Sequence, residues 1–502
     1  MPSAPSPGPL ATPDPSADPA AVAGPGDIAE PTSAPPVRRT ARPLAELPGD
    51  PLALDPEEMR RLGYWVVDQV VAHVAGKGSG PAVRVGDPGD LRSTLGGPVP
   101  SEPGDVQAAM EALVDVALPH MQHGDHPRYF ARVPGPSSFP AVLGEWLGTG
   151  HQAIATSWGG GSGPATVELV VCEWLASVLG LPESTEGVLL SGGSMANVTA
   201  LVAVRAVLGE GVAYLSDQTH SSIARGLRLL GWSAEQISVV PTGEDLRLPV
   251  EELRRRMAAD REAGRRPLVV IATAGTTNTG TVDPLEDLAD LCAIEDVWLH
   301  VDGAYGGPAA LCAPGRDELA GITRADSVVL DPHKWLFQPY DVGCLLVTRP
   351  GVLERAYTMN PEYLADVTAG TGEVDLRNRS LELSRRSRAL KLWLTMRGYG
   401  TRALADAVER GIALAEHAEG LLRADPFWEV VTPAQLGVVT FAAVGATGED
   451  HTRAAAALSD DGYAALTTTT LHGRSVLRLC TINPATTGAD LEGTLTRLAA
   501  YL

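Results

Sequence analysis

The sequence contains very little lysine. Among its 502 residues it has 39 basic side chains, of which only Lys77, Lys334 and Lys391 are lysines, so arginine supplies the other 36. Arginine stays protonated in proteins, whereas a desolvated lysine can lose its proton and attack a carbonyl as an amine. A lysine retained in so arginine-rich a chain is therefore a candidate catalytic group. Lys334 is the clearest case, because it ends an apolar run in "SVVLDPHKWLFQPYDVG".

The sequence also lacks paired cysteines, long apolar runs and an excess of positive charge, and each of these absences argues against a class of protein. The five cysteines are scattered and form no C-x-x-C pair, so neither a zinc site nor a disulfide framework is indicated, and a reducing cytoplasm is expected. No run of 18 apolar residues exists, so no transmembrane helix is expected. The net charge of −22 argues against nucleic acid and anionic membranes as partners.

Composition divides the chain into four expected parts. Residues 1–50 hold 13 of the 40 prolines and predict a disordered tail. Residues 51–118 form an N-terminal helical segment, because "PEEMRRLGYWVVDQVVAHVAG" has apolar residues three and four apart. Residues 119–380 form a large domain, and residues 381–502, which mix helices with short strands, form a small C-terminal α+β domain.

The large domain is predicted to be an α/β structure. From residue 187 short apolar runs such as "GVLLS", "VAYLS", "PLVVIATAG" and "SVVLDP" alternate with amphipathic helices. Fully apolar strands between helices are typical of a mostly parallel sheet that is covered on both faces.

Four chemically capable groups fall at the ends of these strands. Residues 192–194, in "LLSGGSMANV", offer backbone N–H groups to an anion; Asp302 ends "HVD", His220 ends "SDQTH" and Lys334 follows "SVVLDPH". Each group alone also has a purely structural interpretation: the glycines can form a turn without a ligand, and Asp302 or His220 can cap a helix. Together they match pyridoxal phosphate, which needs an anion site, a carboxylate for its ring nitrogen, a flat stacking group and an amine.

The order of these motifs resembles the group II pyridoxal-phosphate-dependent decarboxylases, the aromatic-L-amino-acid decarboxylase family. The resemblance runs from about Leu54 to the C-terminus and is carried by "HPRYFARVP", "GSGPATVELVV", "SGGSMANVTAL", "YLSDQTHSS", "HVDGAYGG", "DPHKW" and "NPEYL". It implies fold type I of these enzymes, with a seven-stranded sheet in the large domain.

The resemblance also implies roles for single residues around the ring of the cofactor. Lys334 would form the Schiff base, and Asp302 would pair with the ring nitrogen. Ala304 would pack beneath the ring, His220 would stack on its opposite face, and Thr277 would lie beside the ring oxygen.

Other positions are implied to hold the phosphate and to complete the reaction. Met195 and Ala196 occupy the phosphate-binding turn of the family, with Ser327 and His333 nearby. Tyr363, in "NPEYL", matches the tyrosine that returns a proton after carbon dioxide leaves.

Some positions depart from the animal enzymes of the family. Gly135 replaces a threonine that contacts the phosphate, and Gly124 and Thr156 replace aromatic residues of the substrate pocket. These departures leave the reaction in place but make an aromatic substrate less certain.

The sequence therefore predicts decarboxylation of an L-amino acid, aromatic or related, to its amine. The resemblance implies a homodimer with a shared active site, and the scattered cysteines indicate the cytoplasm. One alternative is decarboxylation coupled to oxidative deamination, which releases an aldehyde; relatives with that activity typically carry phenylalanine at position 363 or replace His220. The other is a non-catalytic protein of the same fold, against which the retention of Lys334 counts.

Overall fold

A computed structural model describes residues 50–133, 135–359 and 372–502. The described residues fall into two units, which divide between Tyr64 and Trp65. Tyr363 and residues 1–49 of the expected tail lie outside the described residues, and the four-part division of the chain remains a prediction. In the described parts of the chain, no helix is both long enough and apolar enough to cross a membrane.

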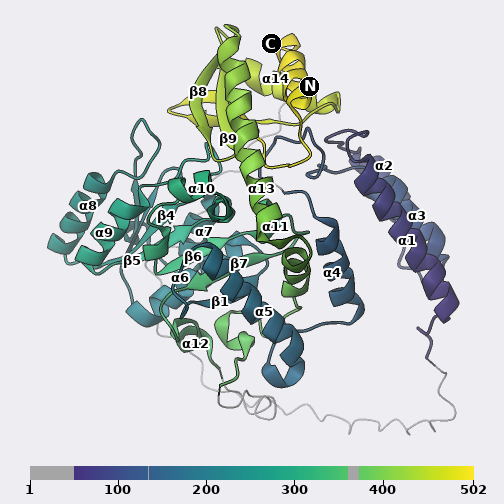
Figure 1. Cartoon of the computed structure of the whole chain (residues 1–502), viewed down its shortest axis with the longest axis horizontal. Helices are drawn as coiled ribbons and strands as arrows, with labels where there is room; N and C mark the ends of the chain where they lie inside the picture. Colours follow the sequence, from purple (N-terminus) through teal and green to yellow (C-terminus); the bar gives the residue numbers. More distant parts are fainter. Residues whose placement is uncertain (1–49, 134, 360–371) are drawn as a thin grey trace, which may run out of the picture. The chain divides into compact units, whose positions relative to one another are not determined.

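Seven strands form the large sheet in the order β1-β7-β6-β5-β4-β2-β3 (Figure 1). Strands β2 to β6 are mutually parallel, whereas β7 is antiparallel to both of its neighbours, β1 and β6. The mostly parallel seven-stranded sheet expected from the sequence is confirmed. The strands are β1 (Glu186–Leu190), β2 (Val212–Ser216), β3 (Ile237–Val240), β4 (Pro267–Thr273), β5 (Trp298–Asp302), β6 (Ser327–Leu330) and β7 (Gly343–Val347).

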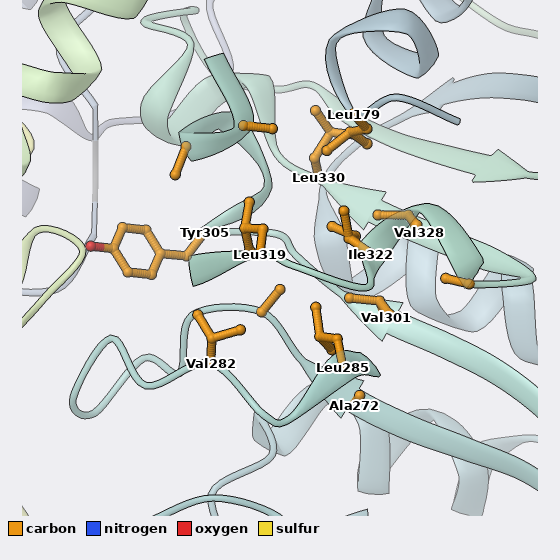
Figure 2. Packing of buried hydrophobic residues seen from close by; sticks show 14 of the residues in the cluster. Leu179, Ala272, Val282, Leu285, Val301, Tyr305, Leu319, Ile322, Val328 and Leu330 are labelled. Carbon is orange, nitrogen blue, oxygen red and sulfur yellow. The ribbon is translucent and has the colours of Figure 1, made fainter. Parts of the chain in front are cut away.

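Both faces of this sheet are buried, because its strands are apolar at successive positions. In β1, Val188 and Leu190 join one hydrophobic cluster, while Leu189 between them joins the other. Figure 2 shows the second cluster, where Val301 of β5 and Val328 of β6 lie near one another. Alternate side chains of a strand point to opposite faces, so each apolar run supplies both cores.

Helices cover the two faces of the sheet, as expected (Figure 1). Helices α6, α7 and α12 contribute to the cluster of Val188, whereas α5, α8, α9 and the start of α13 contribute to the cluster of Leu189. The helices of this part are α4 (Phe139–Gly150), α5 (Trp158–Val178), α6 (Gly193–Leu208), α7 (Ser221–Leu229), α8 (Val250–Glu262), α9 (Leu285–Glu295), α10 (Ala313–Glu318), α11 (Pro332–Trp335) and α12 (Val352–Tyr357).

The N-terminal helices begin with α1 (Pro56–Gly76), which has the bounds that the apolar spacing predicts. It is followed by α2 (Pro88–Leu95), α3 (Val106–Ala112) and a π-helical turn, η2 (Leu113–Ala117). Asp87 caps α2, since its carboxylate accepts hydrogen bonds from the N–H groups of Gly89 and Asp90 at 2.8 and 3.0 Å.

A second, antiparallel sheet forms the C-terminal part, in the order β10-β11-β9-β8. The long helix α13 (Ala389–Ala424) runs from the large sheet to this smaller one (Figure 1). Capping boxes at Thr447 and Thr487 begin its two further helices. The elements are β8 (Trp428–Gln435), β9 (Val438–Ala443), α14 (Gly448–Asp460), β10 (Thr467–Leu471), β11 (Arg474–Cys480) and α15 (Gly488–Ala500).

Candidate active site

A cavity of about 340 Å³ lies where strands β1, β2, β4, β5 and β6 end. Seven residues expected at the site line it: Met195, His220, Thr277, Asp302, Ala304, His333 and Lys334. The carboxyl ends of parallel strands meet at one edge of a sheet, which is why residues more than 130 positions apart converge there.

Helix α6 begins at this cavity with a turn that only glycine can form. Gly192 has φ 146°, in the region that favours glycine. A Cβ atom on Gly193 would lie 2.8 Å from Oδ2 of Asp331 and 3.0 Å from Cβ of Ala304. The first N–H groups of a helix have no partner within it, so this turn offers donors to an anion.

The expectation for Ala196 is corrected. Its N–H group already donates to the carbonyl of Gly192 at 2.9 Å, and its side chain is fully buried in the apolar cluster beneath the helix. Ala196 therefore does not line the cavity, and the donors available to an anion are those of the preceding residues, which include Met195.

Lys334 points toward acidic side chains inside the cavity. Its Nζ lies 3.1 Å from Oδ2 of Asp331, which is 2% exposed as a residue. Burial alone would lower the pKa of Lys334, but the carboxylates of Asp331 and Asp302 outweigh it and raise this pKa above the usual value. The amine is therefore held as an ammonium.

Asp302 ends β5 and is almost completely buried. Its Oδ1 accepts a hydrogen bond from the N–H of Ala304 at 3.1 Å, and its Oδ2 accepts one from Nδ2 of Asn197 at 3.0 Å. Both bonds stabilise an ionised carboxylate in a place with little water.

His220 has two roles, since it caps a helix and also lines the cavity. Its Nδ1 accepts a hydrogen bond from the N–H of Ser222 at 3.3 Å, at the start of α7. Burial lowers the pKa of His220, with Lys334 acting in the same direction and Asp302 opposing it. The ring is therefore mainly neutral at pH 7 and is suited to stacking.

The expectation for Ser327 as a phosphate neighbour is also corrected. Ser327 is fully buried in β6, where its Oγ accepts a hydrogen bond from Nε1 of Trp298 at 2.8 Å and lies 2.7 Å from Nδ1 of His300. Ser327 does not line the cavity. Its side chain lies within the part of the sheet that helices cover, and not at the strand ends where the cavity is.

Sequence reasoning missed several residues that line the cavity: Asn197, Thr273, Asp331 and Tyr340. Oγ1 of Thr273 and Oδ1 of Asp331 are buried without a hydrogen-bond partner. The ring of Tyr340 lies 4.6 Å from the ring of His333. Asp331 stands three residues before Lys334, a spacing that brings both side chains to the same side of a helical turn and that could have identified it.

Gly135 lies against the backbone of Lys334. A Cβ atom on Gly135 would lie 1.6 Å from the carbonyl oxygen of Lys334, so a side chain cannot be added without moving one of the two segments. Glycine at position 135 therefore permits the close approach of these two segments.

Comparison with known proteins agrees with this arrangement. Residues 88–444 match the family model described as the pyridoxal-dependent decarboxylase conserved domain. The chain belongs to this family. It is similar to an aromatic-L-amino-acid decarboxylase of Bacillus atrophaeus, with 43% identity over 89% of this chain and 96% of that protein.

Two further similarities concern a solved structure and a different activity. The crystal structure of Oryza sativa TDC with PLP and tryptamine superposes with a TM-score of 0.84 at 30% identity, covering 89% of this chain and 98% of that chain. A phenylacetaldehyde synthase of a Rosa hybrid cultivar is 33% identical over 85% of this chain and 90% of that protein.

The protein is a pyridoxal-5'-phosphate-dependent amino-acid decarboxylase, and the cavity fits its cofactor. A glycine turn at the start of a helix, a lysine amine and a buried carboxylate line the same cavity, and the unpartnered hydroxyl of Thr273 adds a further polar group to its lining. These are the groups that a phosphate, an aldehyde and a ring nitrogen require.

Proposed function

We propose that Lys334 and Asp302 are the central catalytic residues and that the substrate is an aromatic L-amino acid. The observation that carries this proposal is that the amine of Lys334 and the carboxylate of Asp302 line one cavity with the start of α6. The names of the relatives support the aromatic substrate class.

Each residue of the cavity has a part in this proposal. The N–H groups at the start of α6, including that of Met195, bind the phosphate, and His333 lies beside them. Lys334 would hold the cofactor through its amine, and the amine of the substrate would replace that of Lys334 on the same aldehyde carbon, which leaves Lys334 as a free amine. Bound pyridoxal phosphate supplies an electron sink, because its charged ring accepts the electron pair released when the carboxylate leaves Cα.

The remaining residues orient the ring. Asp302 keeps positive charge at the ring nitrogen by Coulomb attraction in a nearly dry site. His220 would stack on one face of the ring and Ala304 would pack against the other, while Thr277 would lie beside the ring oxygen; all three line the cavity. Tyr363, outside the described residues, is proposed to return the proton to Cα.

We also propose that the protein is a cytoplasmic homodimer with an active site shared between subunits. An apolar groove of about 540 Å³ is lined by Trp65 and Val70 of α1, Met110 of α3, and Leu113 and Val114 of η2. Leu113 is 54% exposed, and a second copy of the chain would cover it. All five cysteines are free and buried, in keeping with a reducing compartment.

The substrate is tested by a decarboxylation screen of the purified enzyme with the twenty amino acids, DOPA, 5-hydroxytryptophan, diaminobutyrate and ornithine. Release of carbon dioxide from aromatic amino acids, with the matching amine as product, is the expected result. Preference for diaminobutyrate or ornithine would overturn the substrate class but not the reaction.

The aldehyde-forming activity is a second candidate, favoured by the similarity to phenylacetaldehyde synthase. Product analysis in air and under nitrogen separates the two. Amine without peroxide supports the decarboxylase, whereas stoichiometric aldehyde, ammonia and peroxide in air would support the oxidative reaction.

A further inference from the structure

A row of polar side chains runs from the core of the large sheet to Asp302. Trp298, His300 and Asp302 occupy alternate positions of β5 and therefore share one face of the sheet. Ser327 lies opposite His300 in the register of β5 and β6, and Asn197 comes from α6, which covers this face. His300 and Ser327 are 0% exposed and Asn197 is 1% exposed.

Consecutive members of this row are within hydrogen-bond distance. Nε1 of Trp298 lies 2.8 Å from Oγ of Ser327, and Nδ1 of His300 lies 2.7 Å from the same oxygen. Nε2 of His300 lies 2.9 Å from Oδ1 of Asn197, and Nδ2 of Asn197 lies 3.0 Å from Oδ2 of Asp302. The row is thus unbroken from the indole to the carboxylate.

The chemistry of the groups fixes the direction of every bond. An ionised carboxylate only accepts, so Asn197 must turn its NH₂ group to Asp302 and its Oδ1 to His300. Nε2 of His300 must then carry a proton and donate, which leaves Nδ1 as an acceptor for the hydroxyl of Ser327. That hydroxyl in turn accepts from the indole N–H of Trp298, which can only donate.

Neutral His300 is required for this order, and its surroundings make it neutral. Burial lowers the pKa of His300 to about 4, although Asp302 opposes the effect. One ring nitrogen therefore carries the only proton at pH 7, and the contact with Asn197 places it on Nε2.

We propose that Asn197, His300 and Ser327 are positioning residues, which keep the Asp302 carboxylate aimed at the ring nitrogen of the cofactor. This inference rests on the proposed role of Asp302. Each donor points toward the carboxylate, so the dipoles of the chain add, and hydrogen bonds linked in one direction strengthen one another.

A purely structural role explains the row less well. The surrounding cluster is apolar, with Val188, Leu190, Val329 and Leu345 among its members, and polar groups in such a place stabilise the fold little compared with well-packed apolar ones. The row also ends on the one carboxylate that the reaction is proposed to need.

The test measures the charge of the cofactor ring rather than activity. Pyridoxal phosphate labelled with ¹⁵N is bound to the cofactor-depleted protein, and the nitrogen NMR signal distinguishes a protonated ring from a neutral one. Asn197→Leu removes the donor to Asp302 at similar volume, and we expect the signal to move toward the neutral form. The apparent dissociation constant of the cofactor should rise about tenfold or more, as for loss of a hydrogen bond to a charged group.

Ser327→Ala provides a milder variant, because it removes a hydroxyl that three successive hydrogen bonds separate from the carboxylate. We expect a change in the same direction as for Asn197→Leu, but smaller. Thr199→Ala is the matched control, because Thr199 is 1% exposed on the same helix and its hydroxyl donates only to the carbonyl of Met195, at 2.8 Å. It should lose some thermal stability without changing the nitrogen signal.

Asp302→Ala separates this inference from the proposed function. If Asp302→Ala leaves the nitrogen signal unchanged, the role of Asp302 itself is wrong. If Asp302→Ala changes the signal while Asn197→Leu and Ser327→Ala do not, the positioning role is wrong and the proposed function stands. Should Asn197→Leu fail to fold, Ser327→Ala decides alone: an unchanged signal rejects the inference.

Discussion

Lys334 and Asp331 form an ion pair inside the cavity, with Nζ of the lysine 3.1 Å from Oδ2 of the aspartate. Asp331 lies beside the glycine turn as well, since a Cβ on Gly193 would lie 2.8 Å from the same oxygen. In the proposed arrangement this carboxylate would affect cofactor uptake in two ways. It keeps the lysine protonated, and it places negative charge where the phosphate is proposed to bind.

Replacement of Asp331 by asparagine should speed the uptake of the cofactor. The amine of Lys334 reacts only when it is neutral, and Asp331 contributes to raising the pKa of Lys334. Without this charge the pKa falls, so the midpoint of uptake against pH should move to lower pH. At pH 7 the rate should rise about threefold or more, measured by the visible absorbance after pyridoxal phosphate is added to cofactor-depleted protein.

Pyridoxal without phosphate is the control for Asp331→Asn. An equal gain with both aldehydes assigns the effect to the lysine, whereas a gain confined to pyridoxal phosphate assigns it to repulsion of the phosphate. Slower uptake of both aldehydes, or an unchanged pH midpoint, would contradict the proposed effect on Lys334.

Replacement of Lys334 by alanine should abolish the visible absorbance of the covalently bound cofactor and nearly all turnover. Arginine should not restore either, because its guanidinium stays protonated. Lys391→Arg serves as the comparison, since Lys391 is also buried but donates to the carbonyls of Pro339 and Asp341 rather than facing the cavity. Wild-type absorbance and rate in Lys334→Ala would contradict the assignment.

Replacement of Asp302 by alanine should lower kcat by about 10²-fold or more, as expected for loss of a buried electrostatic stabiliser. The substrate does not contact this carboxylate in the proposed arrangement, so KM should change much less than kcat. Steady-state kinetics with saturating cofactor measure both. An unchanged kcat would mean that the carboxylate only supports the local fold.

The sequence predicted the sheet well because most of its strands contain runs of successive apolar residues, a pattern that is typical of strands buried on both faces. It also located Lys334, Asp302 and His220, since residues that follow such strands gather at one edge. The same reasoning does not apply to Ser327. It begins β6 rather than following it, so its hydroxyl lies deep in the sheet, and only the register with His300 reveals its partner.

Asp331 and Asn197 were missed for different reasons. Asp331 was not predicted because it shares the motif "DPHKW" with Lys334, and the lysine by itself accounts for the expected amine. Asn197 belongs to the second turn of α6, and its contact with Asp302 joins residues 105 positions apart. Polar residues at alternate positions of "WLHVD" were nevertheless a signal, because a polar side chain on a buried strand face requires a partner there.

A buried ion pair beside the large sheet provides a prediction about stability. Nη2 of Arg385 lies 2.6 Å from Oε1 of Glu168, and both side chains are 0% exposed. The same carboxylate oxygen accepts from the N–H of Leu189, and the guanidinium donates to the carbonyls of Ala155 and Leu189. The pair thus connects α5 and β1 with the segment before α13.

Replacement of Arg385 by methionine alone should destabilise the fold by about 3–5 kcal/mol, because it leaves the Glu168 carboxylate buried without its partner. Replacement of both residues, Glu168→Leu with Arg385→Met, should recover much of that loss, since two apolar side chains remove both buried charges. Urea unfolding of the two variants and the unmodified protein measures the difference. Arg385 lies outside the cavity lining, so the rate per folded molecule should stay close to that of the unmodified enzyme. If the single variant is as stable as the double one, the pair is not isolated from water as its burial indicates.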